Sequence, residues 1–167
     1  MKKILFLFFF TLVSMNANAG CDDPIGDGVD YTNCRFSDGQ DLAGSYLPNS
    51  NLSFSTFIQV NFDKSIMMNS ILAFGTFSES SFIRANLYEA NLQGANLEQS
   101  NFTSANLTRA NLTGATLIGS NFKNANLMEA DFTSANILGV NFEGANLNKS
   151  IWADGKICGI NSIGKCN

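Results

Sequence analysis

A five-residue repeat constrains this chain more than any other feature. Taking every fifth residue from Leu42 to Trp152 gives 23 positions, of which 12 are Leu and 8 are Phe, and none is polar. Two residues before these centres stands Ala or Ser in 19 of the 23 units, and the residue just before the centre is Asn or Asp in 15. Neither the 3.6 period of a helix nor the period of two in a strand keeps all the centres on one face. A coil that turns a corner after every fifth residue does.

A second period of 20 residues indicates that four units complete one turn of this coil. Stacked turns place like residues above one another, where aromatic rings stack and neighbouring backbones pair at the ~4.8 Å spacing of strands. Phe recurs at this interval through most of the repeat region, at Phe62, Phe82, Phe102, Phe122 and Phe142. The sequence therefore predicts a four-sided, parallel β-coil with large centres and small residues inside.

The pattern Ala, then Asn or Asp, then Leu or Phe, then two variable residues resembles the repeat of the pentapeptide repeat family. The resemblance implies an all-β fold, a right-handed quadrilateral parallel β-helix, here a solenoid over residues 42–152 with about five and a half turns. Eight units match the strict pattern, beginning at Ala85, Ala90, Ala95, Ala105, Ala110, Ala125, Ala130 and Ala145.

The N-terminus reads as an export signal. Lys2 and Lys3 precede a ten-residue apolar stretch at 4–13 that is broken only by Thr11, and Ala17-Asn18-Ala19 has the small residues of a cleavage site. We therefore predict a signal peptide at 1–19 and a periplasmic or secreted protein. No later apolar run approaches the ~18 residues of a membrane span. A lipoprotein acylated on Cys21 is the weaker alternative, because Asn18 stands where such signals usually carry an aliphatic residue.

Four cysteines lie outside the repeat, and export favours disulfides between them. Three pairings are possible, of which closeness in sequence favours Cys21–Cys34 and Cys158–Cys166. An open β-solenoid presents unpaired edges that promote aggregation, so its ends need covers. We predict disulfide-stapled caps at 20–41 and 153–167.

Catalytic chemistry is not indicated. The chain has no His and no C-x-x-C motif, which removes Ser/His/Asp and Cys/His triads and the usual zinc sites. Charged residues make up 14% of the chain, and those in the repeat are scattered. We predict no enzyme activity, no cofactor and no metal. The repeat, with 7 acids and 5 bases, has neither the basic stripe of a nucleic-acid binder nor the acidic face of a DNA mimic.

Several outward positions in the first turns are apolar. Spacings of 20 place them on two adjacent sides, and large apolar patches tend to be interaction surfaces. Two interpretations remain open: residues 20–41 fold over this patch, or the patch binds a partner or a second copy. The residues are Tyr46, Phe54, Ile66, Met68, Ile71, Phe74 and Tyr88, together with Pro48.

These observations predict a non-catalytic exported protein, either structural or protein-binding, in the cell envelope. Its partner would be an envelope or extracellular protein, or a second copy. The family resemblance implies one alternative, a topoisomerase-protecting DNA mimic. The export signal and the nearly neutral repeat disfavour that role, because topoisomerase is cytoplasmic.

Overall fold

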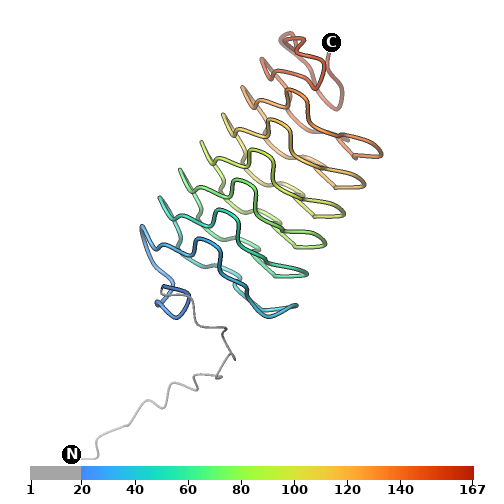
Figure 1. Cartoon of the computed structure of the whole chain (residues 1–167). Coiled ribbons are helices and arrows are strands. Elements are labelled where there is room, and N and C mark those ends of the chain that lie inside the picture. Colours follow the sequence, from blue (N-terminus) through green and yellow to red (C-terminus); the bar gives the residue numbers. More distant parts are fainter. Residues whose placement is uncertain (1–19) are drawn as a thin grey trace, which may run out of the picture.

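The computed structural model describes residues 20–167, so the signal peptide predicted at 1–19 lies outside the described residues. Within 20–167 the backbone forms no helix and no extended strand. Single bridge residues alternate instead with tight turns, one of each in every five-residue unit. The chain winds upward as a coil, with its N-terminal turns at one end and its C-terminal residues at the other (Figure 1).

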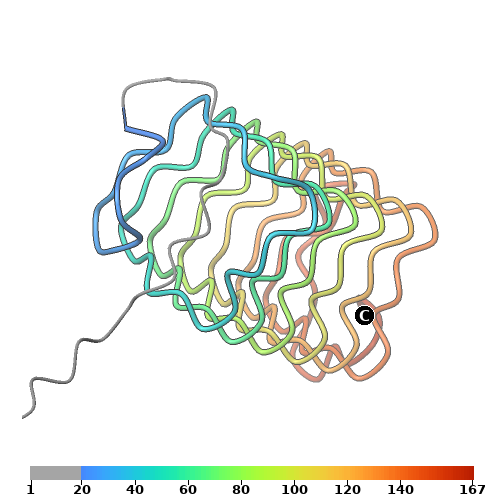
Figure 2. The ribbon, with the colours of Figure 1, turned by 90° about the horizontal axis from the view of Figure 1, so that it is seen from below.

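Successive turns pair in parallel at a spacing of 20 residues. Bridges such as Asn86↔Asn106 and Asn91↔Asn111 recur four times in each turn, so each position in one turn lies beside its counterpart in the next. The Leu87 amide donates to the Asn106 carbonyl at 2.7 Å, and the Asn106 amide donates to the Ala85 carbonyl at 2.9 Å. The coil is therefore a β-solenoid, and Figure 2 shows its turns lying behind one another.

Each unit turns its corner with a left-handed residue. In the unit centred on Leu87, the Ala90 amide donates to the Leu87 carbonyl at 3.0 Å, and Glu89 has a φ of 55°. Every residue at this place from Gly44 to Lys149 has a positive φ, as the third residue of a type II turn requires. Glycine adopts this conformation freely, whereas other residues pay about 1–2 kcal/mol.

The interior is filled by the repeat centres. Phe102 stacks on Phe82 and on Phe122 with ring centroids 4.7 Å apart in both cases, and all three rings are fully buried. The residue before the centre holds the adjoining turn. Asn106 Oδ1 accepts the Thr108 amide at 3.2 Å, while its Nδ2 donates to Asn86 Oδ1 at 3.0 Å. Asn is thus preferred before the centre for two reasons: its oxygen accepts a hydrogen bond from its own turn, and its amide group can bond an Asn in the preceding turn.

Parallel pairing begins before residue 42, the predicted start of the solenoid. Asp30 bridges Asn51 at a spacing of 21 residues, and Arg35 bridges Thr56 at the same spacing. The buried centre Phe36 precedes the buried centre Leu42 by six positions, whereas centres within the repeat are five positions apart. This one extra residue shifts the register, which is why the strict repeat stops at 42 while the coil continues.

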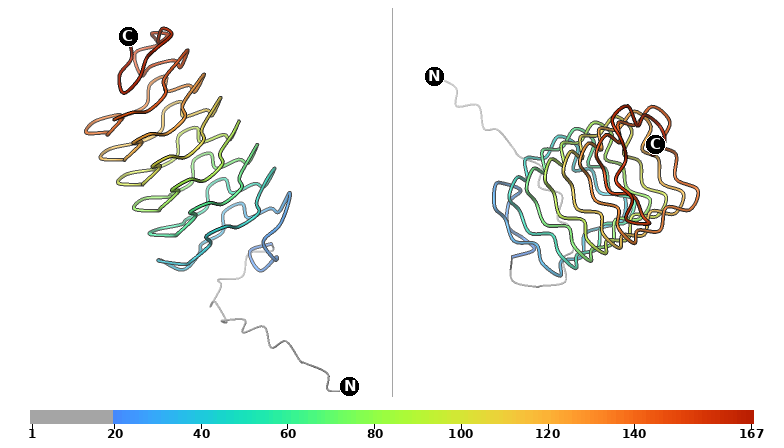
Figure 3. Two further views of the ribbon diagram at one scale, coloured as in Figure 1. Left: turned by 180° about the vertical axis from the view of Figure 1, so that it is seen from behind. Right: turned by 90° about the horizontal axis from the view of Figure 1, so that it is seen from above.

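The two ends carry disulfides in the arrangement favoured by sequence proximity. Cys21 bonds to Cys34 with Cα atoms 5.5 Å apart, and Cys158 bonds to Cys166 with Cα atoms 4.9 Å apart. After Trp152 the chain reverses and pairs antiparallel with the last turn, through the bridges Ile151↔Ile157 and Asn146↔Ile163. The C-terminal residues therefore lie across part of the end of the coil (Figure 3).

Candidate interaction surface

Two phenylalanine rings stack on the outside of the coil. Phe54 and Phe74 both occupy the left-handed corner position, with φ of 58° and 57°. Their centroids lie 5.4 Å apart at an interplanar angle of 13°, yet the residues are 57% and 52% exposed. We call this pair the aromatic ladder. A bulky residue with positive φ is an outlier in proteins, so the sequence places rings here at an energetic cost.

Gly94 ends the aromatic ladder. It follows Phe74 in the same corner column, and a Cβ built at Gly94 would lie 2.6 Å from two carbons of the Phe74 ring. Only a glycine lets the ring settle on the backbone of the next turn. The ladder therefore has a fixed support on one side and exposed ring edges toward solvent.

Three further apolar side chains lie on the outside near the ladder. Ile71 belongs to the same unit as Phe74, and Tyr46 forms a bridge with Ile66 on the preceding side. All three are exposed. One turn further along, Asn86 and Asn91 occupy the places of Ile66 and Ile71. The apolar patch is thus confined to the first complete turns of the coil.

The N-terminal segment covers only one predicted member of this patch. The Gly28 amide donates to the Pro48 carbonyl at 2.9 Å, and Pro48 is buried. The aromatic ladder and its three apolar neighbours stay exposed in the presence of residues 20–41. The interpretation in which this segment folds over the patch therefore applies to Pro48 alone.

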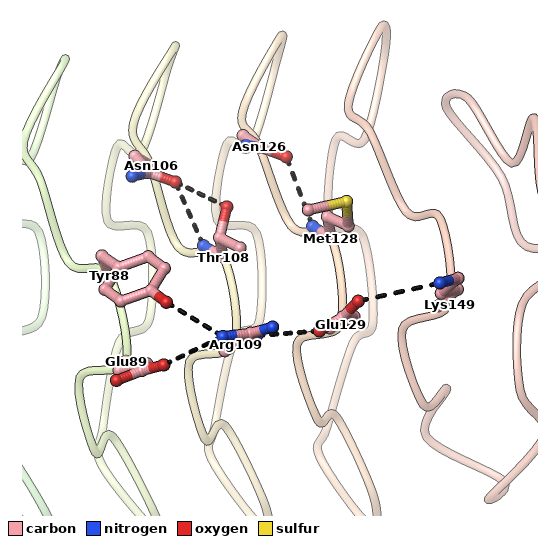
Figure 4. Close-up of polar contacts among 9 residues, drawn as sticks. All are labelled: Tyr88, Glu89, Asn106, Thr108, Arg109, Asn126, Met128, Glu129 and Lys149. Atoms are coloured by element: carbon pink, nitrogen blue, oxygen red, sulfur yellow. Dashed lines mark hydrogen bonds and ion pairs between the residues drawn. The ribbon is translucent and has the colours of Figure 1, made fainter.

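Met68 and Tyr88 are only half-buried, and Tyr88 lies in a different environment. Its hydroxyl oxygen accepts a hydrogen bond from Arg109 Nη1 at 3.0 Å (Figure 4). Arg109 also bonds Glu89 at 3.3 Å and Glu129 at 2.8 Å. Tyr88 therefore joins the apolar patch to a row of charged corner residues.

This row, which we call the charged ladder, continues from Glu129 to Lys149, whose Nζ lies 4.0 Å from Glu129 Oε1. The hydrogen bond from Arg109 keeps the pKa of Glu129 below its ordinary value, and the two carboxylates raise that of Arg109. All four charged groups face solvent, so the pairs contribute little to stability. The alternating signs recur at 20-residue intervals in the sequence, which is the feature that would have revealed the ladder.

Elsewhere on the surface of residues 20–167, charged side chains also pair across turns. Lys123 pairs with Glu143 at 2.9 Å, again between adjacent turns. Within residues 20–167 no three His, Cys, Asp or Glu side chains come together as metal ligands. In the same part of the chain, no helix has the length and apolar character needed to cross a membrane.

The coil of stacked five-residue units and its side-chain pattern define a class of protein, the repeat β-solenoids. Eight copies of the family described as pentapeptide repeats match this sequence, over residues 41–72, 80–117 and 110–148. These matches span more than half of the chain. The protein belongs to the pentapeptide repeat family.

Several solved structures are similar to this chain. HetL, a pentapeptide repeat protein involved in heterocyst differentiation regulation in the cyanobacterium Nostoc sp. strain PCC 7120, is 20% identical, with 80% of this chain and 91% of HetL covered and a TM-score of 0.33. Rfr23 from the cyanobacterium Cyanothece 51142 is 25% identical, with 77% and 88% covered and a TM-score of 0.35.

A pentapeptide repeat protein from the thylakoid lumen of Arabidopsis thaliana is 28% identical, with 70% of each chain covered and a TM-score of 0.37. The comparison with curated proteins finds no match to this sequence.

Proposed function

We propose that this protein is a non-catalytic, exported binding module that recognises another protein of the cell envelope or the extracellular space through its aromatic ladder. The observation that carries the proposal is the pair of exposed, stacked rings of Phe54 and Phe74 at left-handed corners. All corner residues from 44 to 149 have this backbone conformation, but the others are polar or glycine, so the two rings depart from the pattern of their position. Rigid aromatic side chains lose little entropy on binding, and aromatic residues are enriched among interface hot spots.

The immediate surroundings of the ladder favour a protein partner. Tyr46, Ile66 and Ile71 extend an apolar surface around the two rings. Tyr88 and Arg109 border it with a polar edge. An apolar centre with a polar rim is the usual anatomy of a protein–protein interface. No basic stripe accompanies it, so nucleic acid is a poor ligand.

Export and the finer features of the fold belong to the same proposal. The signal sequence at 1–19 and two disulfides support a periplasmic or secreted protein. The 20-residue bridge spacing supports a quadrilateral coil, to which family resemblance adds the right-handed sense and about five and a half regular turns. Absence of His and scattered charges support a role without catalysis.

A double variant, Phe54→Asn with Phe74→Asn, tests the proposal. Asn suits a left-handed corner and occupies it at Asn49 and Asn69. Removing each half-exposed ring forfeits up to ~2.5 kcal/mol of burial, from roughly 100 Å² at 25 cal/mol per Å², and relieves about 1 kcal/mol of strain. The folded protein should therefore survive. Its matched control is Ser104→Asn with Ser134→Asn, two polar corner residues on later turns.

The assay captures envelope and extracellular proteins on the immobilised mature chain and then measures direct binding of the captured protein after purification. We expect the Phe variant to lose at least tenfold in affinity and the Ser variant to bind like the wild type. Equal binding by all three proteins would refute a role for the aromatic ladder.

A further inference from the structure

The C-terminal end of the coil is only half covered. Over one half, the reversed C-terminal segment supplies hydrogen-bond partners to the last turn. The Leu147 amide donates to Ser162 at 2.8 Å, the Lys149 amide to Cys158 at 3.0 Å and the Trp152 amide to Lys156 at 2.7 Å. These amides of the last turn therefore have backbone partners, as in an inner turn, although the covering segment runs antiparallel.

The other half, residues 135–144, is an open β-edge. One turn earlier, the Leu117 amide donates to Asn136 and the Gly119 amide donates to Leu138. Within residues 20–167, the equivalent groups of the last turn have no such partner. The unpaired groups are the amides of Ile137, Gly139, Phe142 and Gly144 and the carbonyls of Ala135 and Val140.

This open edge is mainly apolar. It carries one charged residue, Glu143, which pairs with Lys123 of the preceding turn at 2.9 Å. Leu138 is 70% exposed, and Ile137 and Val140 are half-buried. At the N-terminal edge the exposed residues include the charged Arg35 and Asp41. Exposed charges protect a β-edge from pairing, whereas an apolar edge invites it. The two ends of the solenoid are therefore not equivalent.

The C-terminal segment beside the open edge is also apolar on its outside. Ile157, Ile160 and Ile163 are each more than half exposed. The open edge and the segment 153–167 together contain two acids, Glu143 and Asp154, and two bases, Lys156 and Lys165. Their charges balance, so two such ends would not repel one another.

We propose that two copies of this protein associate through their C-terminal ends. Each end has the form of a step, because the cap covers one half and rises about one strand spacing, ~4.8 Å, above the open half. A twofold axis along the edge of the step brings the cap of each copy over the open half of the other. Such an interface is isologous and closed, with apolar residues on both sides.

The proposed dimer leaves the aromatic ladder free. Phe54 and Phe74 belong to the first complete turns. The segment 135–144 lies toward the opposite end of the coil (Figure 1). A dimer would thus display two aromatic ladders, and a partner with two binding positions would gain avidity. The proposal is independent of the identity of that partner.

The test substitutes Leu138→Glu in the mature, disulfide-bonded chain. A glutamate is compatible with this column, because Glu98 occupies the same position two turns earlier. The control is Ile118→Glu, in the same column one turn from the end. Sedimentation velocity is measured from micromolar to millimolar concentrations, and amide hydrogen exchange is followed at 135–144.

We expect wild-type protein and the Ile118 variant to reach twice the monomer mass, with exchange at 135–144 slowing as concentration rises. The Leu138 variant should stay at the monomer mass, with fast exchange at every concentration. A wild type that stays monomeric throughout, or a Leu138 variant that still dimerises, would overturn the proposal. Growth to unlimited mass would also overturn it, since it indicates head-to-tail stacking. A dimer that is lost in Phe74→Ser and retained in Leu138→Glu would place self-association on the aromatic ladder instead.

Discussion

Two buried serines that differ in hydrogen bonding allow a sharp test of the interior. Ser65 and Ser80 both occupy the small inward position and are at most 1% exposed. Ser80 Oγ donates to the Phe57 carbonyl at 2.9 Å and accepts the Val60 amide at 3.0 Å, so it bridges two groups that close the turn directly in other units. Ser65 Oγ has no hydrogen-bond partner. Alanine at each position should therefore act in opposite directions.

The expected magnitudes follow from these contacts. Ser65→Ala removes a buried hydroxyl with an unmet hydrogen bond and should stabilise the protein by about 1 kcal/mol, since such groups cost ~1–3 kcal/mol. The change fits the space, because Ala85 occupies the same position in the next turn. Ser80→Ala leaves the Val60 amide and the Phe57 carbonyl without their bridge and should destabilise by about 2 kcal/mol.

Thermal unfolding with intact disulfides measures the difference. At ~2–4 °C per kcal/mol for a chain of this size, the two melting temperatures should differ by roughly 6–12 °C. Ser100→Ala provides an intermediate case: its hydroxyl donates to Phe77 at 2.7 Å, but the turn keeps its own bond, from the Ser80 amide to Phe77. If Ser65→Ala and Ser80→Ala shift the melting temperature in the same direction, the reasoning from hydrogen-bond satisfaction is wrong.

Three further predictions concern the first turns. Burial, aided by the charge of Asp23, raises the pKa of Tyr31 to about 12, so its contribution of about 1–2 kcal/mol is complete below pH 10 and disappears as pH rises from 10 through 12. Tyr31→Phe should flatten the stability profile in that window, as measured by guanidinium unfolding. Gly94→Ala should lower the melting temperature, at a cost of about 1–2 kcal/mol, because a methyl group meets the Phe74 ring and φ is +63°. Replacing the Cys21–Cys34 pair by serines should cost ~3 kcal/mol in unfolding free energy, from closure of a loop with sequence separation 13.

The repeat made most of the interior predictable. Large centres every fifth residue can share one interior only in a coil, and the 20-residue recurrence of Phe82 and Phe102 corresponds to direct stacking. The start of the coil was harder to predict from the sequence. A single extra residue between Phe36 and Leu42 breaks the period, and only the backbone pairing of Asp30 and Arg35 reveals that the coil continues.

The outer surface was predictable in location but not in detail. Counting by five assigns Phe54 and Phe74 to the outside, and counting by 20 places them together. The period does not reveal that Pro48 lies under the N-terminal segment, because that segment has no repeat to register it. Nor does it show that Tyr88 bonds Arg109, since that contact depends on side-chain conformation. Such facts arise where irregular segments and long side chains meet the regular coil.

The residue directly before each centre shows which hydrogen bonds the apolar patch gives up. Asn at this place accepts the amide two residues later, as Asn91 does for Gln93 at 3.0 Å. Ile66 and Ile71 cannot accept a hydrogen bond with their side chains, so the turns that follow them forgo this contribution of about 1 kcal/mol each.

Tyr46 gives up the same hydrogen bond, and Pro48, the residue that would donate it, has no amide hydrogen. Pro48 is buried beneath the segment 20–41, so the sequence has removed the donor at a covered turn. In the turns after Ile66 and Ile71 the corresponding residues are Met68, which is half-buried, and Ala73, which is buried. Phe54 and Phe74 add bulky apolar rings at left-handed corners, where the other corner residues from 44 to 149 are polar or glycine. Departures from local rules that lack a structural gain mark functional positions. Here they coincide on the same turns, which is why the binding role is assigned to this patch and not to the regular faces beyond Gly94.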